Sequence, residues 1–280
     1  MGGGKGGRGK GGDAKSMRRV PRALVGISSV LVLTGAASAR SLPAPADYGT
    51  VIIDNFSAQA GIPPVRFDHW LHRSKFTCRV CHVDIGFAME AKGTKISAAT
   101  NMKGSYCGSC HNGRVAYDGE KVFPACSTDP TPKENGGCLR CHSLGSKARR
   151  KYDYVSFTEN LPKQGAGNLV DWEKAEALGL IKPVDSVPGL SVSRPPLSAQ
   201  EDFSITSRGW MPNIVFSHKK HALWNGCEVC HPDIFPMVKK GAVRYSMFQI
   251  FEEEYCGLCH GRVAFPLYDC EKCHVDRVRR

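Results

Sequence analysis

What the chain lacks narrows its class before any motif is considered. No segment reads His-Glu-x-x-His, although ten histidines are present among the 280 residues, so a helical zinc-protease site is excluded. The one long apolar run, residues 23–37, is shorter than the roughly 20 residues that a membrane-spanning helix needs. We therefore expect neither a metalloprotease nor a mature protein that crosses a membrane.

The most informative pattern is Cys-x-x-Cys-His, which occurs six times. It is the attachment sequence of covalent c-type haem, in which each Cys sulfur forms a thioether and the His binds the iron as proximal ligand. Zinc-binding pairs and redox dithiols are the alternative, but neither needs a His directly after the second Cys. The predicted attachment residues are Cys78, Cys81, Cys107, Cys110, Cys138, Cys141, Cys227, Cys230, Cys256, Cys259, Cys270 and Cys273, and the predicted proximal ligands are His82, His111, His142, His231, His260 and His274.

The six motifs predict six covalent haems and use 12 of the 13 cysteines, so no disulfide framework is expected. The remaining thiol is Cys126. A buried, inert thiol is the usual explanation of a lone Cys, and a link between two chains in an oxidising compartment is the alternative.

The four other histidines form two His-x-x-His pairs, His69 with His72 and His218 with His221. Residues three apart lie on one face of a helix, where their side chains diverge enough to reach two different irons. We interpret each pair as distal ligands to two adjacent haems. The alternative is that they are surface or structural histidines.

The two halves of the chain repeat. Phe67 opens FDHWLHRSKFTCRVCH and Phe216 opens FSHKKHALWNGCEVCH, with the same spacing through both His to both Cys. The offset is 149 residues for the first motif (78 to 227) and for the second (107 to 256). We therefore predict two triheme modules related by duplication, residues 66–143 and 211–280.

Each module resembles the c7-type triheme cytochrome domain of the cytochrome c3/c7 superfamily, through F-x-H-x-x-H, three haem motifs and Y-C-G-x-C-H at the second. The resemblance implies a mainly irregular fold with short α-helices, little β-structure and haems as the core. We expect six aromatic side chains to pack on haem faces and edges: Phe67, Phe216, Trp70, Trp224, Tyr106 and Tyr255. The resemblance also implies that the first His of each pair serves the first motif and the second His the second motif. The implied pairs are His69 with His82, His72 with His111, His218 with His231, and His221 with His260.

In the family, the third haem takes its distal ligand from between the first two motifs. No His lies there in either module, but two Met do: Met89 and Met102 in the first, Met237 and Met247 in the second. A thioether is a known sixth ligand of c-type haem. We expect Met89 and Met237 to serve the haems of His142 and His274, with Met102 and Met247 as alternatives, unless these Met only fill space against porphyrin.

The segments outside the modules have their own signatures. Residues 1–39 combine a Gly- and Lys-rich extension, a basic stretch, the apolar run and Ala37-Ser38-Ala39, which predicts a secretory signal peptide; an uncleaved anchor is the alternative. Residues 40–65 are a lead-in. Residues 144–210 are a linker, with a short helix expected at 171–178, between an acidic start and Gly179.

The net charge of +12 does not indicate nucleic-acid binding. Residues 1–39 hold seven Lys/Arg and one Asp, which leaves the mature chain at +6. Six haems with two propionates each add roughly −6 when ferric and −12 when ferrous, so the holoprotein is near neutral or acidic.

These patterns predict an electron-transfer protein rather than an enzyme. We expect a hexahaem cytochrome of the periplasm; association with the outer membrane or an extracellular position is the alternative location. The expected partners are membrane quinol-oxidising cytochromes, outer-membrane cytochromes or metal ions, with no nucleic acid. The alternative is a multihaem reductase of nitrite, hydroxylamine or a metal ion, with an open haem at His142 or His274. A structural subunit of a multihaem conduit is a third possibility.

Overall fold

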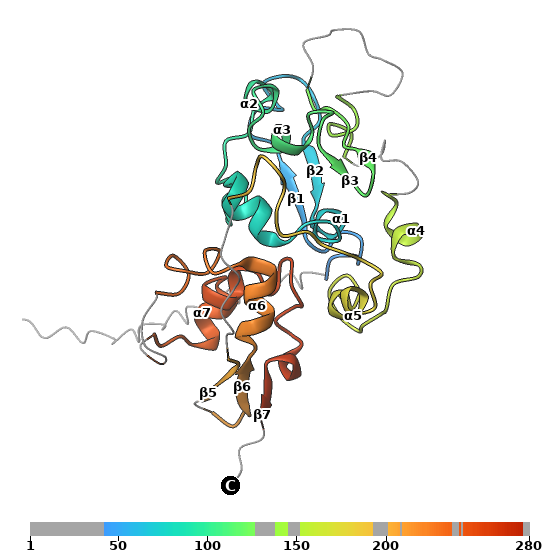
Figure 1. The fold of residues 1–280 in the computed structure, drawn as a ribbon. Helices are drawn as coiled ribbons and strands as arrows, with labels where there is room; N and C mark the ends of the chain where they lie inside the picture. Colours follow the sequence, from blue (N-terminus) through green and yellow to red (C-terminus); the bar gives the residue numbers. More distant parts are fainter. Residues whose placement is uncertain are drawn as a thin grey trace, which may run out of the picture. The chain divides into compact units, whose positions relative to one another are not determined.

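A computed structural model describes residues 42–126, 138–144, 152–192, 201–207, 209–236, 241 and 243–276, which belong to one compact unit, Leu42–Arg280 (Figure 1). The predicted signal peptide and Met237 lie outside the described residues. Irregular backbone joins a few short helices and small sheets, which confirms the predicted fold class. Within the described ranges, no helix combines the length and apolar character of a membrane span.

The first module is built around a two-stranded antiparallel sheet. Strand β1 (Thr50–Ile53) lies in the predicted lead-in and pairs with β2 (Val65–Asp68), which runs directly into helix α1 (His69–Arg73). A π-helical turn, Val80–Ile85, carries the end of the first motif. Helix α2 (Ala98–Met102) precedes α3 (Cys107–Cys110), and the hairpin of β3 (Ala116–Tyr117) and β4 (Glu120–Lys121) follows.

The second module repeats this plan. Strand β5 (Phe203–Ile205) pairs with β6 (Asn213–Phe216), and β7 (His274–Asp276) adds a third strand to the sheet. Helix α6 (His218–Asn225) starts two residues after β6, as α1 follows β2. Helix α7 (Met247–Phe251) corresponds to α2, and short 3₁₀ turns at Tyr255–Leu258 and Cys270–Lys272 carry the second and third motifs.

The same local chemistry shapes the approach to the second motif in both modules. Ser97 and Ser246 each cap the following helix in a reciprocal capping box, with Thr100 and Gln249 as partners. The Tyr before the motif then takes a left-handed φ, 51° at Tyr106 and 50° at Tyr255, which turns the chain sharply.

A glycine inside this motif allows the closest backbone approach. A Cβ added to Gly108 would lie 1.9 Å from the carbonyl oxygen of Asn101 in α2, and one added to Gly257 would lie 2.0 Å from that of Ile250 in α7. Real Cβ atoms essentially never come within 3.0 Å of another heavy atom. The Gly of Y-C-G-x-C-H is therefore the residue that lets the second motif pack against the preceding helix.

Among the described residues, the linker supplies four of the five members of the buried apolar cluster. Helices α4 (Tyr154–Thr158) and α5 (Trp172–Ala177) lie here, and Asp171 caps α5 by accepting from the Lys174 amide at 3.0 Å. The buried cluster consists of Trp70, Val170, Trp172, Ala175 and Ile181. Thus Trp70 packs among linker residues, which corrects the expectation that it packs on haem; the linker aromatics cover it instead.

Candidate haem-binding site

The structure brings together the four histidine pairs that the family resemblance implies. Ring centroids lie 6.5 Å apart for His69 and His82, and 6.3 Å for His72 and His111. The second module gives 6.4 Å for His218 and His231, and 6.2 Å for His221 and His260. A metal that binds one nitrogen of each ring lies about 2 Å from both nitrogens. Each ring centroid lies about 1.1 Å behind its nitrogen, so two rings on opposite sides of the metal have centroids about 6.2 Å apart. All four pairs therefore have the spacing for one axially ligated metal.

Hydrogen bonds fix the tautomer of nine of the ten histidines. In each, Nδ1 lies 2.5 to 3.3 Å from a backbone carbonyl oxygen. A carbonyl only accepts, so Nδ1 carries the proton and Nε2 keeps the lone pair that a metal needs. The nine pairs are His69 with Gly49, His72 with Asp68, His82 with Phe87, His111 with Phe123, His142 with Pro63, His221 with Ser217, His231 with Phe235, His260 with Phe265 and His274 with Pro212.

Burial keeps these imidazoles neutral. It lowers the pKa of His69 to about 4, that of His72 to about 3 and that of His260 to about 4. Burial also lowers the pKa of His82 and His111. A metal binds the neutral ring, so at neutral pH these side chains need lose no proton before ligation.

Burial has the opposite effect on the cysteines. It raises the pKa of Cys81, Cys107 and Cys259 to about 12, and that of Cys230 and Cys256 to about 11. Metal-binding thiolates require environments that lower the pKa. These surroundings suit an uncharged sulfur, as in a thiol or a thioether.

One cavity of about 4200 Å³ contains the whole set: all thirteen cysteines and all ten histidines line it. A single small-molecule site usually measures about 300–1,000 Å³. The residues present therefore fit several large covalently attached macrocycles, each held by two sulfurs and approached by His Nε2.

Aromatic side chains hold the histidines in equivalent ways in both modules. Phe67 lies against His72 with centroids 4.4 Å apart, and Phe216 against His221 at 4.5 Å. Such contacts fix the plane of the ring while its Nε2 stays free.

A second pair of aromatics was not predicted from the sequence. Phe123 lies 4.4 Å from His111 and Phe265 lies 4.2 Å from His260, and each also offers its carbonyl to that His. A cation from the third motif covers each Phe ring, Arg140 at 4.1 Å and Lys272 at 5.4 Å. The sequence contains little signal for this pair, because the spacing differs between the modules: Phe123 stands twelve residues after His111, whereas Phe265 stands five after His260.

The third site of each module has a different partner set. His142 donates to the Pro63 carbonyl and His274 to the Pro212 carbonyl, both at 2.7 Å. Met89 lines the cavity half-buried, whereas Met102 and Met247 also line it but are 46% and 39% exposed. Burial thus favours Met89 over Met102 as a candidate ligand.

The fold and the site define a multihaem c-type cytochrome. The family model "Cytochrome c7 and related cytochrome c" matches residues 65–143 and 214–276, which are 79 and 63 residues, or 142 of 280. The chain belongs to this family, with its domain in tandem. It is therefore an electron-transfer protein with covalently bound c-type haem.

Solved structures with similarity to the chain are multihaem cytochromes. The chain is 22% identical to the C-terminal hexaheme fragment of GSU1996, over 84% of this chain and 98% of that one, with a TM-score of 0.25. The N-terminal hexaheme fragment of GSU1996 is 22% identical, over 82% of this chain and 99% of that one, with a TM-score of 0.24. The dodecaheme cytochrome c GSU1996 is 22% identical, over 81% of this chain and 74% of that one, with a TM-score of 0.26. At these TM-scores, the alignments carry no argument about how the parts are arranged. A comparison with curated proteins gave no match.

Proposed function

We propose that the chain carries six covalent c-type haems, one at each Cys-x-x-Cys-His motif, and acts as a periplasmic hexahaem electron carrier. The observation that supports this most strongly is the common cavity that all motif Cys and all His line. Because neighbouring motifs share this cavity, cofactors held there lie close to one another without intervening protein layers.

We further propose which side chains occupy the axial positions. Four sites are bis-His, formed by the four ring pairs with centroids 6.2 to 6.5 Å apart. The two others combine His142 with Met89 and His274 with Met237. When bound, the haem iron supplies reversible one-electron chemistry. The chain's part is to cap both faces with ligands held by carbonyls and aromatic rings, so that the ligand set stays the same in both oxidation states.

Electrons enter and leave where attachment cysteines reach the surface. Cys138, Cys227 and Cys270 are exposed, whereas the other nine motif cysteines are partly buried. A sulfur at the surface brings the edge of its haem to solvent. Redox proteins, such as membrane quinol-oxidising cytochromes or outer-membrane cytochromes, would exchange electrons there, and reduction of metal ions at the same edges is possible without an open coordination position.

Location follows from residues 1–39, whose basic, apolar and small-residue segments are typical of a secretory signal. Attachment of haem after export is consistent with the small apolar cluster, five buried residues around Trp70 and Trp172, that the described part of the chain forms.

Intact-mass spectrometry of the exported protein tests the proposal, with six haem additions expected. Electron paramagnetic resonance then checks ligation: six low-spin signals, unchanged by cyanide or nitrite, are expected. A high-spin signal that responds to cyanide would instead favour the reductase reading, with the open position at His142 or His274. Fewer than six additions would contradict the hexahaem proposal.

A further inference from the structure

We propose that Arg73 is a cation shared by two haem sites, one in each module, and that its charge raises the reduction potential of both. The sites are those of His69 with His82 and of His221 with His260. This inference rests on the proposed haem ligation. Its basis is a junction at which residues from both modules and the linker surround one guanidinium.

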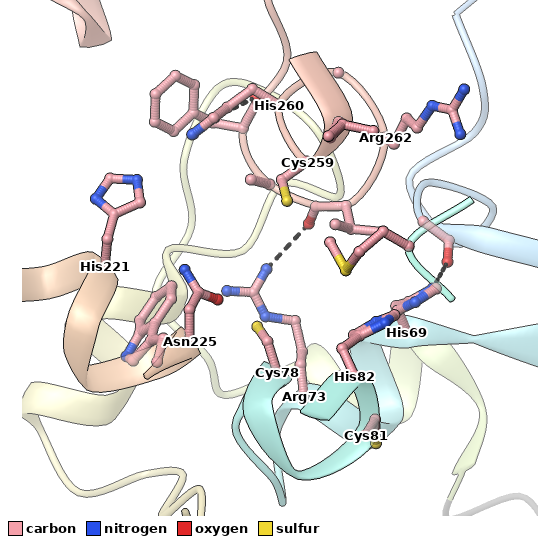
Figure 2. A pocket seen from close by; sticks show the side chains of 18 of the residues that line it. His69, Arg73, Cys78, Cys81, His82, His221, Asn225, Cys259, His260 and Arg262 are labelled. Carbon is pink, nitrogen blue, oxygen red and sulfur yellow. Dashed lines mark hydrogen bonds between the residues drawn. The ribbon is translucent and has the colours of Figure 1, made fainter. Parts of the chain in front are cut away.

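Arg73 connects the modules directly. It is the last residue of α1, and its Nη1 donates to the carbonyl oxygen of Val263 at 3.1 Å. Val263 stands three residues after His260, so the bond ties α1 to the loop behind a proposed ligand of the second module. Figure 2 shows the guanidinium between the sulfurs of Cys78 and Cys259.

The attachment cysteines of both modules converge at this point. Burial raises the pKa of the Cys259 thiol to about 12, and nearby Cys78 and Cys230 raise it further. Arg73 in turn is close enough to Cys78 to interact with it electrostatically. Arg73 thus lies beside a sulfur of the first module, and that sulfur interacts in turn with the sulfur of Cys259 in the second module.

Two tryptophans enclose the guanidinium. Its Cζ lies 5.0 Å from the ring centroid of Trp172 in α5 and 5.1 Å from that of Trp224 in α6. Trp224 is itself fixed, because its indole N–H donates to a Glu176 carboxylate oxygen at 2.7 Å. Aromatic faces hold a cation without neutralising it, and an Arg guanidinium stays protonated in proteins. The charge is therefore permanent, and the Glu176 carboxylate, which interacts with it electrostatically, offsets only part of it.

The loop of the second module that contains Val263 also lies close to Gly49, the residue whose carbonyl orients His69. Gly49 accepts from His69 Nδ1 at 2.6 Å, and a Cβ on Gly49 would lie 3.6 Å from the Arg262 oxygen and 3.7 Å from Val263 Cα. Beside it, the Tyr48 hydroxyl donates to the Ala264 oxygen at 2.5 Å. The two sites are thus adjoining parts of one junction.

Arg73 is not a duplicated scaffold residue. The repeat places Ala222 at the corresponding position, five residues before the first motif Cys. The elements that hold the histidines recur in both modules, but this cation occurs at the junction alone. A structural role common to every module would predict a cation at both positions.

Reduction of a site adds one electron and neither forms nor breaks a bond, so a fixed positive charge favours the reduced form. A unit charge about 10 Å away at an effective dielectric constant of about 20 shifts the equilibrium on the order of tenfold. For a one-electron couple, a tenfold change is about 59 mV.

The test is a redox titration of the full-length holoprotein, with individual haems followed by their NMR methyl signals. Arg73→Met should make two sites about tenfold harder to reduce, one in each module, and Arg73→Lys should keep both within about twofold of wild type. Asn225→Asp is the second variant: Asn225 lines the same cavity directly after Trp224, whose ring lies 5.1 Å from the Arg73 Cζ, so a carboxylate there should shift the same two sites downward without removing Arg73.

Arg262→Met is the matched control. Arg262 belongs to the same loop, but it is paired with Glu253 and its side chain is 35% exposed, so its removal should move no site by more than about twofold. Equal shifts in the Arg73 and Arg262 variants, or no shift in Asn225→Asp, would overturn the inference. If wild type shows four bis-His haems and the variants do not shift, only this inference fails; absent bis-His signals in wild type refute the proposed ligation itself.

Discussion

Replacing Gly257 by Ala should destabilise the second module through a backbone clash. The added Cβ would lie 2.0 Å from the Ile250 oxygen, so the two segments must separate by about 1 Å to reach the 3.0 Å limit. The oxygen cannot rotate away, because it belongs to the backbone and accepts from the Glu253 amide at 3.1 Å. Overpacking of this kind typically costs about 1–3 kcal/mol. We expect a loss at the upper end of that range.

The assay is the free energy of unfolding of the holoprotein in guanidinium chloride, followed by far-UV circular dichroism. Gly165→Ala is the matched control, because a Cβ at Gly165 meets nothing within 4 Å and its φ is not in the left-handed range. The control should stay within about 1 kcal/mol of wild type. Gly108→Ala should match Gly257→Ala, since its Cβ would lie 1.9 Å from the Asn101 oxygen.

The double variant tests whether the clash acts within each module. Gly108 and Gly257 share no contact partner, so their effects should add within about 0.5 kcal/mol. If Gly257→Ala is as stable as Gly165→Ala, the close approach of the second motif to α7 is wrong, and with it our explanation of the Gly in Y-C-G-x-C-H.

Three further predictions concern single side chains. Burial, and secondarily Tyr268, raises the pKa of Tyr48 from 10.0 to about 12, so the stability that its hydroxyl contributes is complete below pH 10 and falls by about 2–3 kcal/mol between pH 10 and 12. Tyr48→Phe should lack this loss when the free energy of unfolding is measured across that range, and parallel pH curves for the two proteins would contradict it. Arg79→Met should lower the free energy of unfolding by about 3–5 kcal/mol in the guanidinium chloride assay. The reason is that Arg79 and Asp84 form an ion pair of 2.9 Å with side chains only 6% and 2% exposed; a loss below about 1 kcal/mol would refute a buried pair. Met89→Ala should halve the ferric absorption band of Met–haem ligation while Met102→Ala leaves it intact, and the reverse result would reassign the ligand.

Local spacing is what predicts the haem-binding residues. Each Cys-x-x-Cys-His places three groups within five residues, and His-x-x-His puts two rings on one helical face, so α1 and α6 follow from short-range geometry. The pairing of His69 with His82 across 13 residues came from the family resemblance rather than from spacing. The structure brings those rings to 6.5 Å.

The supports of the histidines were not predictable from the sequence. Gly49, Pro63 and Pro212 act through their carbonyl oxygens, which every residue has, and they lie 20, 79 and 62 residues from the histidines that they orient. The apolar cluster around Trp70 was missed for a related reason. Its partners lie some 100 residues later in the linker, and no periodic pattern connects them.

Residues that recur in both modules and residues that do not recur have different structural roles. The parts that recur in both modules, such as Phe67 with Phe216 and Gly108 with Gly257, all position histidines or motif cysteines. Two residues that do not recur, Arg73 and Trp70, join the first module to the second module and to the linker. Arg73 has Ala222 as its counterpart, and buried Trp70 has exposed Lys219.

Duplication alone would have produced two modules that each bind haem and need not touch. The contacts from α1 and α5 to the second module have no counterpart in the repeat, so they are specific to the joined form. Electron transfer between haems depends on their staying close, so a fixed junction is what a conducting pair of modules requires. At this junction a charged side chain is enclosed between two tryptophans, where an apolar residue would pack at lower desolvation cost, and the proposed effect of Arg73 on the reduction potentials gives a reason for that cost.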